Sequence, residues 1–179
     1  MSGRIRNKSR HYWYLISSFI GLIVFIWSGA IYRLTFVPFI GFCSGILALG
    51  LVATLLNLHR FKAAYLLPTW MYFPLAWGCN TISWGFIFSS LFLLSNFMMA
   101  GGEVKRKEFA IVARDVQPGG KGERELLRPT FTISYQGQEK ELVFANRFYK
   151  WKDDCKSVIL TLQEGLWGFE VIKGKAVTK

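Results

Sequence analysis

Few side chains in this sequence are of the types that perform catalysis or bind metals. The chain contains two histidines and three cysteines: His11, His59, Cys43, Cys79 and Cys155. Nucleophilic catalysis pairs Ser or Cys with a histidine that a third group orients. No carboxylate occurs among residues 1–102, which hold both histidines, and the cysteines lack the spacing of zinc ligands. We therefore predict no catalytic residue, no metal site and no cofactor, and we interpret the histidines as polar anchors at membrane interfaces.

One stretch combines cations and aromatic rings in a pattern that suits ligand binding. It runs from residue 147 to residue 152 and reads Arg-Phe-Tyr-Lys-Trp-Lys. Such interleaving binds anionic lipid headgroups or stacks on nucleobases. The predicted contacts to an anion, a lipid or a partner are Arg147, Tyr149, Lys150, Trp151 and Lys152. The alternative is a loop between strands whose rings cover a small core. Contact with a nucleotide or nucleic acid also stays open.

Charge divides the chain into two halves. Residues 1–102 contain seven Lys or Arg and no Asp or Glu, whereas all eleven acidic residues come later. The mean hydropathy of +0.28 is high for a soluble domain. The change in composition at Gly102 therefore indicates a membrane half followed by an extramembrane half. The predicted parts are a basic N-terminal segment (1–11), a transmembrane domain (12–102) and a β domain (103–179).

The uncharged run of residues 63–102 decides the predicted number of membrane spans. A transmembrane helix needs about 20 apolar residues, so this run is long enough for two. Gly78-Cys79-Asn80-Thr81 is its most turn-prone point, and we predict a tight turn there. Two earlier apolar runs complete a four-helix transmembrane bundle. The predicted spans cover residues 12–32, 34–58, 63–78 and 82–102.

Two sets of residues are expected to shape this bundle. Gly41, Gly45 and Gly50 form a stripe of small residues, the glycine seam, where another helix can approach closely. That helix belongs either to the same chain or to another copy in a homo-oligomer. Pro68 and Pro74 each remove a backbone hydrogen bond, so we expect a kink in the third span. The kink is either a fixed feature of packing or the moving part of a gate.

The distribution of Lys and Arg predicts the orientation, because these residues accumulate at the cytoplasmic ends of spans. With four spans, nine of them lie on one side and Arg33 lies alone on the other. We therefore predict an integral protein of the plasma (inner) membrane with both termini and the β domain in the cytoplasm. An odd number of spans would place the C-terminal half on the opposite side and would contradict this charge count.

The C-terminal half has the pattern of short β-strands. Phe131, Ile133 and Tyr135 alternate along one strand, and Gln136-Gly137-Gln138 then turns the chain back. A second hairpin and one earlier strand are expected as well. The predicted strands cover residues 109–115, 130–135, 139–145, 158–163 and 166–172. Five such strands form a small barrel or a curled sheet, so the fold class is an α+β membrane protein.

The predicted function is that of a non-enzymatic membrane subunit. Its helices would anchor and oligomerise the protein in the lipid bilayer, and its β domain would dock a cytoplasmic protein partner within a larger complex. The alternative is a ligand-gated effector or channel with the β domain as sensor. This layout resembles that of components of prokaryotic antiviral defence systems, which implies the gated function. The uncharged spans argue against a proton pump or coupled transporter.

Overall fold

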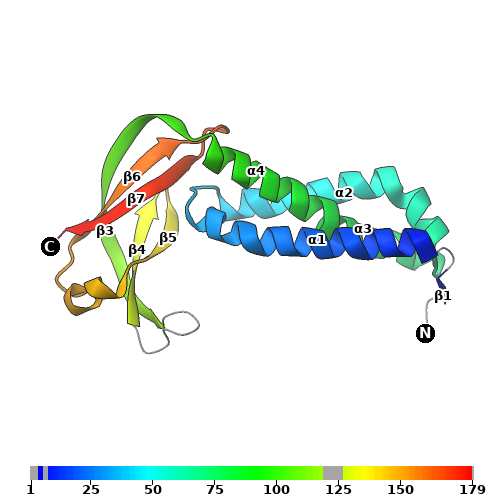
Figure 1. The fold of residues 1–179 in the computed structure, drawn as a ribbon, viewed down its shortest axis with the longest axis horizontal. Helices are drawn as coiled ribbons and strands as arrows, with labels where there is room; N and C mark the ends of the chain where they lie inside the picture. The colour runs from blue at the N-terminus through cyan, green and yellow to red at the C-terminus, as the bar shows by residue number, and fades with distance from the viewer. Residues whose placement is uncertain (1–3, 6–7, 119–126, 179) are drawn as a thin grey trace. The chain divides into compact units, whose positions relative to one another are not determined.

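The computed structural model describes residues 4–5, 8–118 and 127–178. It divides into two compact units, a helical unit over Met1–Met99 and a β unit over Ala100–Lys179 (Figure 1). The division falls close to the change in composition at Gly102. We describe each unit by itself.

Three helical runs form the helical unit. The first two are α1 (Lys8–Arg33) and α2 (Phe39–Ala64). The third run is continuous and comprises η1 (Thr69–Met71), α3 (Tyr72–Asn80), η2 (Thr81–Gly85) and α4 (Phe86–Met98). η1 is a short 3₁₀ turn, and η2 is a π-helical segment. Within the described residues, these three runs are long and apolar enough to cross a membrane.

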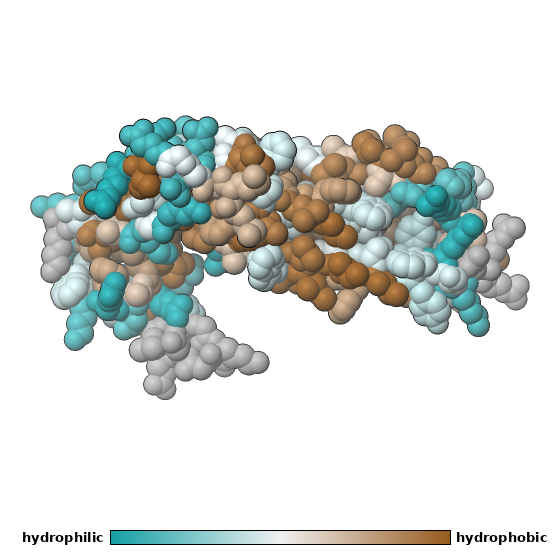
Figure 2. Space-filling view, turned by 45° about the horizontal axis from the view of Figure 1, so that its top comes forward, coloured by the Kyte–Doolittle hydropathy of each residue, from teal (hydrophilic) through white to brown (hydrophobic). Residues whose placement is uncertain are grey.

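The surface of the helical unit is apolar. Only 17% of the apolar window of α1, 17% of that of α2 and 33% of that of the third run are buried within the chain. Large side chains such as Ile26, Ile40 and Leu56 are exposed. Figure 2 shows apolar residues along much of the visible face of this unit. The arrangement suits a lipid environment, since water would not favour so large an apolar surface.

The predicted turn at residues 78–81 is wrong. Gly78, Cys79 and Asn80 lie in α3, and Thr81 begins η2, so the chain continues as a helix. The structure therefore has three candidate spans where the sequence predicted four. The physical reason is the backbone: a tight reversal would leave carbonyl and amide groups at two helix ends without partners in an apolar setting. A continuous helix pairs these groups, and η2 absorbs the local irregularity.

Close backbone contacts surround η2. A Cβ on Gly21 would collide with the carbonyl oxygen of Ile82, and a Cβ on Gly85 would lie 2.8 Å from the carbonyl oxygen of Ile46. A Cβ on Gly50 would lie 2.7 Å from the Cα of Thr81. Glycines on α1 and α2, together with Gly85 itself, therefore let both helices touch the same π-helical segment.

Hydroxyl groups add hydrogen bonds between the same helices. Ser83 Oγ lies 3.2 Å from Ser17 Oγ and 3.0 Å from Ser18 Oγ, which joins η2 to α1. Ser90 Oγ donates to Ser28 Oγ over 3.1 Å, and this bond joins α4 to α1. A third contact joins α3 to α2, where Asn80 Nδ2 donates to Thr54 Oγ1 over 3.3 Å. These buried and half-buried polar groups thus fix how the helices pair.

A short strand pair ties one end of the helical unit together. β1 (Arg4–Ile5) pairs antiparallel with β2 (Tyr65–Leu66), which follows α2. The start of α1 and the end of α2 consequently lie at the same end of the unit. The connection from α1 to α2 and the end of α4 lie at the other end (Figure 1). No feature of the sequence predicted this pair of strands.

The β unit is one antiparallel sheet with the strand order β5-β4-β3-β6-β7. Its strands are β3 (Gly101–Pro118), β4 (Leu127–Tyr135), β5 (Gln138–Val143), β6 (Ser157–Glu164) and β7 (Glu170–Thr178). The long β3 pairs with β6 along its first half and with β4 along its second half, with an irregularity between Ile111 and Ala113. The sheet curls around this shared strand (Figure 1).

Five strands and two hairpins are confirmed, but the last strand, predicted at residues 166–172, lies at Glu170–Thr178. Of the two predicted forms, the sheet is curled and not closed into a barrel. Gln136 and Gly137 have φ of 49° and 77°, as a two-residue hairpin turn requires. Side chains of the concave face fill the core, among them Phe131, Leu160 and Leu162, which are fully buried. β5 and β7 remain edge strands without a backbone ladder between them, so the barrel stays open.

Alanine substitutions in the glycine seam will separate packing within the chain from packing between copies. We expect Gly50→Ala to destabilise the detergent-solubilised protein by about 1–3 kcal/mol, because the added methyl group meets Thr81. Gly45→Ala is the matched control on the same helix, since a Cβ there meets nothing within 4 Å. Thermal unfolding measures the first effect. A Gly45→Ala protein that changes oligomeric state while Gly50→Ala stays stable would show that the seam joins different copies instead.

Candidate anion-binding pocket in the helical unit

A pocket of about 450 Å³ opens in the helical unit and is lined by cations, aromatic rings and neutral polar groups. Seven residues from three elements line it: Arg10, Trp13, Tyr14, Ser17, Asn57, Arg60 and Trp84. A volume of this size is typical of small-molecule sites. We therefore treat this pocket as the candidate functional site.

α1 contributes one helical face to the pocket. Arg10, Trp13, Tyr14 and Ser17 follow one another at intervals of three, one and three residues, which places them on the same side of a helix. The last of them, Ser17, is fixed from both sides, because its hydroxyl donates to the Tyr14 carbonyl oxygen over 3.2 Å and lies near Ser83. The wall is thus held in register with the third helical run.

The other two walls come from α2 and η2. Asn57 and Arg60 are three residues apart near the end of α2 and share a face. Asn57 Nδ2 donates to the carbonyl oxygen of Ala53 over 3.0 Å, which uses one of its two N–H groups. Trp84 enters from η2, the segment that packs against Gly21 and Gly50. π-Helical segments occur frequently at functional sites, because they change the direction of neighbouring side chains.

Aromatic rings that do not line the pocket pack against Tyr14, which does. Tyr14 contacts the ring of Phe61 edge to face at 5.3 Å between centroids, and Phe61 lies 4.6 Å from Tyr65. The Nδ1 atom of His11 lies 3.0 Å from Tyr65 Oη, within hydrogen-bond distance. This contact ties α1 to the connection after α2. His11 thus has a polar partner of its own, whereas His59 is exposed.

The chemistry of the lining favours an anion. Arg10 and Arg60 bring two guanidinium groups to one pocket, and its lining contains no acidic side chain. The neutral lining groups add N–H and O–H donors, among them the indole N–H of Trp13 and of Trp84. A group with several acceptor oxygens and a negative charge therefore matches the site.

The three glycines of the glycine seam have different surroundings, and the two predicted kink prolines lie near the start of the third helical run. Gly50 lies against Thr81, whereas a Cβ on Gly45 would meet nothing within 4 Å and a Cβ on Gly41 would reach only Pro38, at 4.0 Å. Pro68 precedes η1 and so caps the start of the third helical run. Pro74 is the third residue of α3, directly after η1 in the same helical run. The irregular part of this helix is η2, which contains no proline.

The predicted basic and aromatic stretch forms a 3₁₀ segment, η3 (Asn146–Trp151), in the β unit. The guanidinium of Arg147 lies 4.9 Å from the centroid of the Phe148 ring, and Lys152 Nζ lies 5.8 Å from that of Tyr149. Two cations therefore cover rings of their own segment. Lys150 and Trp151 are exposed, the indole to 44%. The Phe148 ring lies 6.0 Å from that of the buried Phe144, as the alternative of a loop whose rings cover the core expects. Contact of this stretch with an anion, a lipid or a partner stays a prediction.

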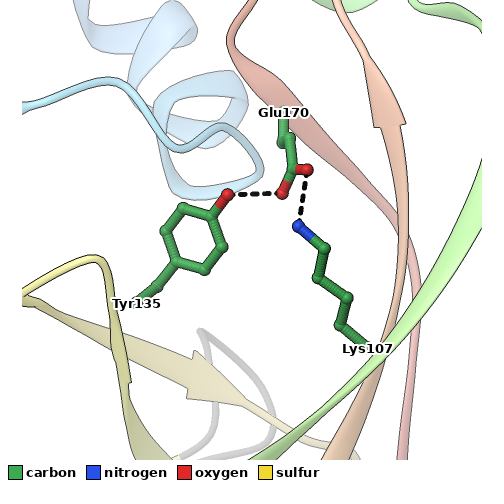
Figure 3. A network of polar contacts seen from close by, with 3 residues as sticks. All are labelled: Lys107, Tyr135 and Glu170. Atoms are coloured by element: carbon green, nitrogen blue, oxygen red, sulfur yellow. Dashed lines mark hydrogen bonds and ion pairs between the residues drawn. The ribbon is translucent and has the colours of Figure 1, made fainter.

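A network of polar contacts holds three strands of the β unit together (Figure 3). Lys107 Nζ on β3 lies 2.8 Å from Glu170 Oε1 at the start of β7. Tyr135 Oη at the end of β4 donates to the other carboxylate oxygen of Glu170 over 2.6 Å. The Lys107 ammonium also lies 5.5 Å from the centroid of the Tyr135 ring. The network links the β5-β4 side of the curled sheet to the β6-β7 side. These two sides otherwise share only β3.

The pKa values of Tyr135 and Glu170 differ from their ordinary values. Burial, together with the hydrogen bond to Glu170, raises the pKa of Tyr135 to about 12. Burial alone would raise the pKa of Glu170, but the hydrogen bonds from Lys107 and Tyr135 outweigh it and lower that pKa below its ordinary value. At neutral pH the carboxylate is thus charged and the phenol is neutral. This arrangement stabilises the sheet and does not activate a nucleophile.

Sequence reasoning missed the pocket, although one signal for it was present. Asn57 is a polar residue inside an apolar helix and lies three residues before Arg60, so both occupy one face. The position of Trp84 depends on η2 and could not be inferred from spacing. Among the described residues, no three His, Cys, Asp or Glu side chains lie close enough together to hold a metal ion.

Comparisons with protein-family models, with curated proteins and with solved structures found no match. The function of the chain is therefore argued from its own residues.

The Glu170 network gives the β unit a definite pH dependence. The folded pKa of Glu170 is lowered, so its stabilising effect is present above the ordinary carboxyl value of 4.5 and is lost as the pH falls through the lowered pKa. The folded pKa of Tyr135 is raised, so its effect is lost as the pH rises from 10 toward about 12. We expect Glu170→Gln to cost about 1–2 kcal/mol near neutral pH.

Urea titration of the full chain in detergent, followed by the methyl NMR signals of Leu160, measures this effect. The difference between wild type and Glu170→Gln should shrink on acidification. Glu139→Gln, an exposed carboxylate on β5, is the control and should change little. A cost that is equal at pH 3 and pH 7 would contradict an electrostatic role for Glu170.

Proposed function

We propose that this chain is an integral membrane protein without enzymatic activity that presents its β domain to a protein partner as a subunit of a larger complex. The observation that carries the proposal is the division into two compact units of opposite surface character. The helices expose apolar side chains such as Ile40 and Leu56, whereas the β unit has its own buried core. An apolar anchor joined to a folded domain is an arrangement for holding that domain at a membrane.

The orientation has to be proposed afresh, because three crossings place the two ends of the helical unit on opposite sides. One end of the helical unit contains the first residues of α1 and the last residues of α2. The sequence places six Lys or Arg there. The other end carries Arg33 and, beyond α4, the three cations of residues 105–107. The larger number favours a cytoplasmic N terminus in the plasma (inner) membrane. We therefore propose that the β domain and its partner lie on the opposite side of the membrane.

The proposed docking surface is η3 with the following Lys152. Lys150 and Trp151 are exposed there, and aromatic residues are enriched where proteins bind one another. The Arg147 and Lys152 side chains lie against rings of the segment, which reduces the entropy cost of ordering them on binding. A partner with acidic groups fits this surface. Oligomerisation through exposed Gly41 and Gly45 is a further part of the proposal.

A second candidate is the ligand-gated effector or channel. The observation that favours it is the position of η2, which lines the pocket through Trp84 and packs against both α1 and α2. Rearrangement of a π-helical segment would change the pocket and the helix contacts together. In this candidate the moving part is η2, whereas the sequence had suggested a kink at Pro68 and Pro74.

Reporter fusions test the number of crossings without reference to absolute orientation. Alkaline phosphatase and a fluorescent protein are fused, in a bacterial host, after Phe36, after Leu66 and at the C terminus. Three crossings predict that the C-terminal fusion reports the same side as the fusion after Phe36 and the opposite side from the fusion after Leu66. Agreement between the C-terminal fusion and the fusion after Leu66 would instead require an even number of crossings.

Purification in mild detergent tests the docking function. We expect the intact particle to contain a second protein, and we expect Lys150→Glu to reduce its recovery at least about tenfold, because charge reversal opposes an acidic surface. Lys173→Glu on β7 makes the same charge change at another exposed position of the β unit and serves as the control. Equal loss in both variants would reject η3 as the docking surface. A homo-oligomer with no second protein would favour the gated effector.

A further inference from the structure

We propose that the pocket between α1, α2 and η2 binds a phosphate group, carried either by the headgroup of an anionic phospholipid or by a soluble phosphate ester. This inference concerns the helical unit alone and does not depend on the docking function of the β domain. It rests on the charge, the donors and the surroundings of the pocket.

The lining of the pocket is positively charged. Arg10 and Arg60 enter from different helices, and each guanidinium group offers five N–H donors. Residues 1–102 contain no Asp or Glu, so every charged side chain in this part of the sequence is basic. Two guanidinium groups at one site match the geometry of phosphate oxygens, which accept pairs of N–H bonds.

The neutral groups of the pocket point to the same ligand class. Asn57 and the indole of Trp84 offer N–H donors, and a phosphate ester offers acceptors. Asn57 retains one N–H group beyond the bond to Ala53. The volume of about 450 Å³ exceeds what a bare ion needs and is suited to an ester with an organic group.

The surroundings favour the lipid source. The pocket occupies the end of the helical unit at which α1 starts, where α1 also exposes Trp13 and Tyr12. Tryptophan and tyrosine at helix ends mark the level of lipid headgroups. Next along α1, Ile16 and Ile20 are exposed apolar side chains, beside which an acyl chain can lie. A lipid would thus place its phosphate in the pocket and its chains on an apolar surface.

Native mass spectrometry of the full chain tests the proposal. The protein is prepared in micelles that contain dioleoylphosphatidylglycerol and an excess of phosphatidylcholine, and retained phosphatidylglycerol is counted. We expect Arg10→Gln combined with Arg60→Gln to reduce retention at least about tenfold, because two charge-assisted contacts are lost. Arg33→Gln removes the arginine at the opposite end of the helical unit and should leave retention unchanged.

Soluble ligands distinguish the two sources. Glycerol 1-phosphate added in millimolar excess should not displace a lipid headgroup. If wild type binds glycerol 1-phosphate and retains no phosphatidylglycerol, and the double variant binds neither, the ligand is a soluble phosphate ester. Equal retention of phosphatidylglycerol by wild type, the double variant and Arg33→Gln would overturn the proposal, since binding would then be general adsorption.

A conservative variant keeps the test decisive if the double glutamine variant does not fold. Arg10→Lys combined with Arg60→Lys preserves the charge of the unit but removes the paired N–H geometry. We expect this variant to retain phosphatidylglycerol several-fold less than wild type does. Retention equal to that of wild type would overturn the assignment of the guanidinium groups as phosphate ligands.

Discussion

The helical unit depends on the close approach of three backbones at η2. Gly21 from α1 and Gly50 from α2 both face this five-residue segment, where any side chain beyond hydrogen would collide. Apolar side chains cannot by themselves specify how helices pair in lipid, because the lipid chains are equally apolar. Steric fit at glycines and hydroxyl bonds such as those of Ser83 must therefore set the register. The rest of the helical unit follows from this contact.

The sequence predicts those features whose cause is local. The turn between β4 and β5 was predictable because Gly137 adopts the left-handed conformation that glycine favours. The extent of α1 was predicted to within a few residues, since charged residues flank an apolar run. In α2 the prediction ended too early, because Arg60 and Lys62 lie inside the helix with long side chains that reach polar surroundings.

Features that depend on distant residues were not predictable in the same way. Whether residues 69–98 turn back or continue is decided by what covers the backbone of η2, and Gly21 and Gly50 lie far away in sequence. The pocket likewise needs Arg10 and Arg60 from different helices. The length of β3 was not predictable for the same reason, because one half of this strand pairs with β6 and the other half with β4.

Packing of the helices and occupancy of the pocket are linked through a single segment. Ser83 and Trp84 are neighbours in η2: the first bonds to α1, and the second lines the pocket. A ligand that binds only when Trp84 is in this position must stabilise the packed arrangement, because binding to one state alone favours that state. Loss of the η2 contacts would in turn weaken the pocket. Helix packing and the shape of the pocket therefore share one structural requirement, the π-helical segment held between Gly21 and Gly50.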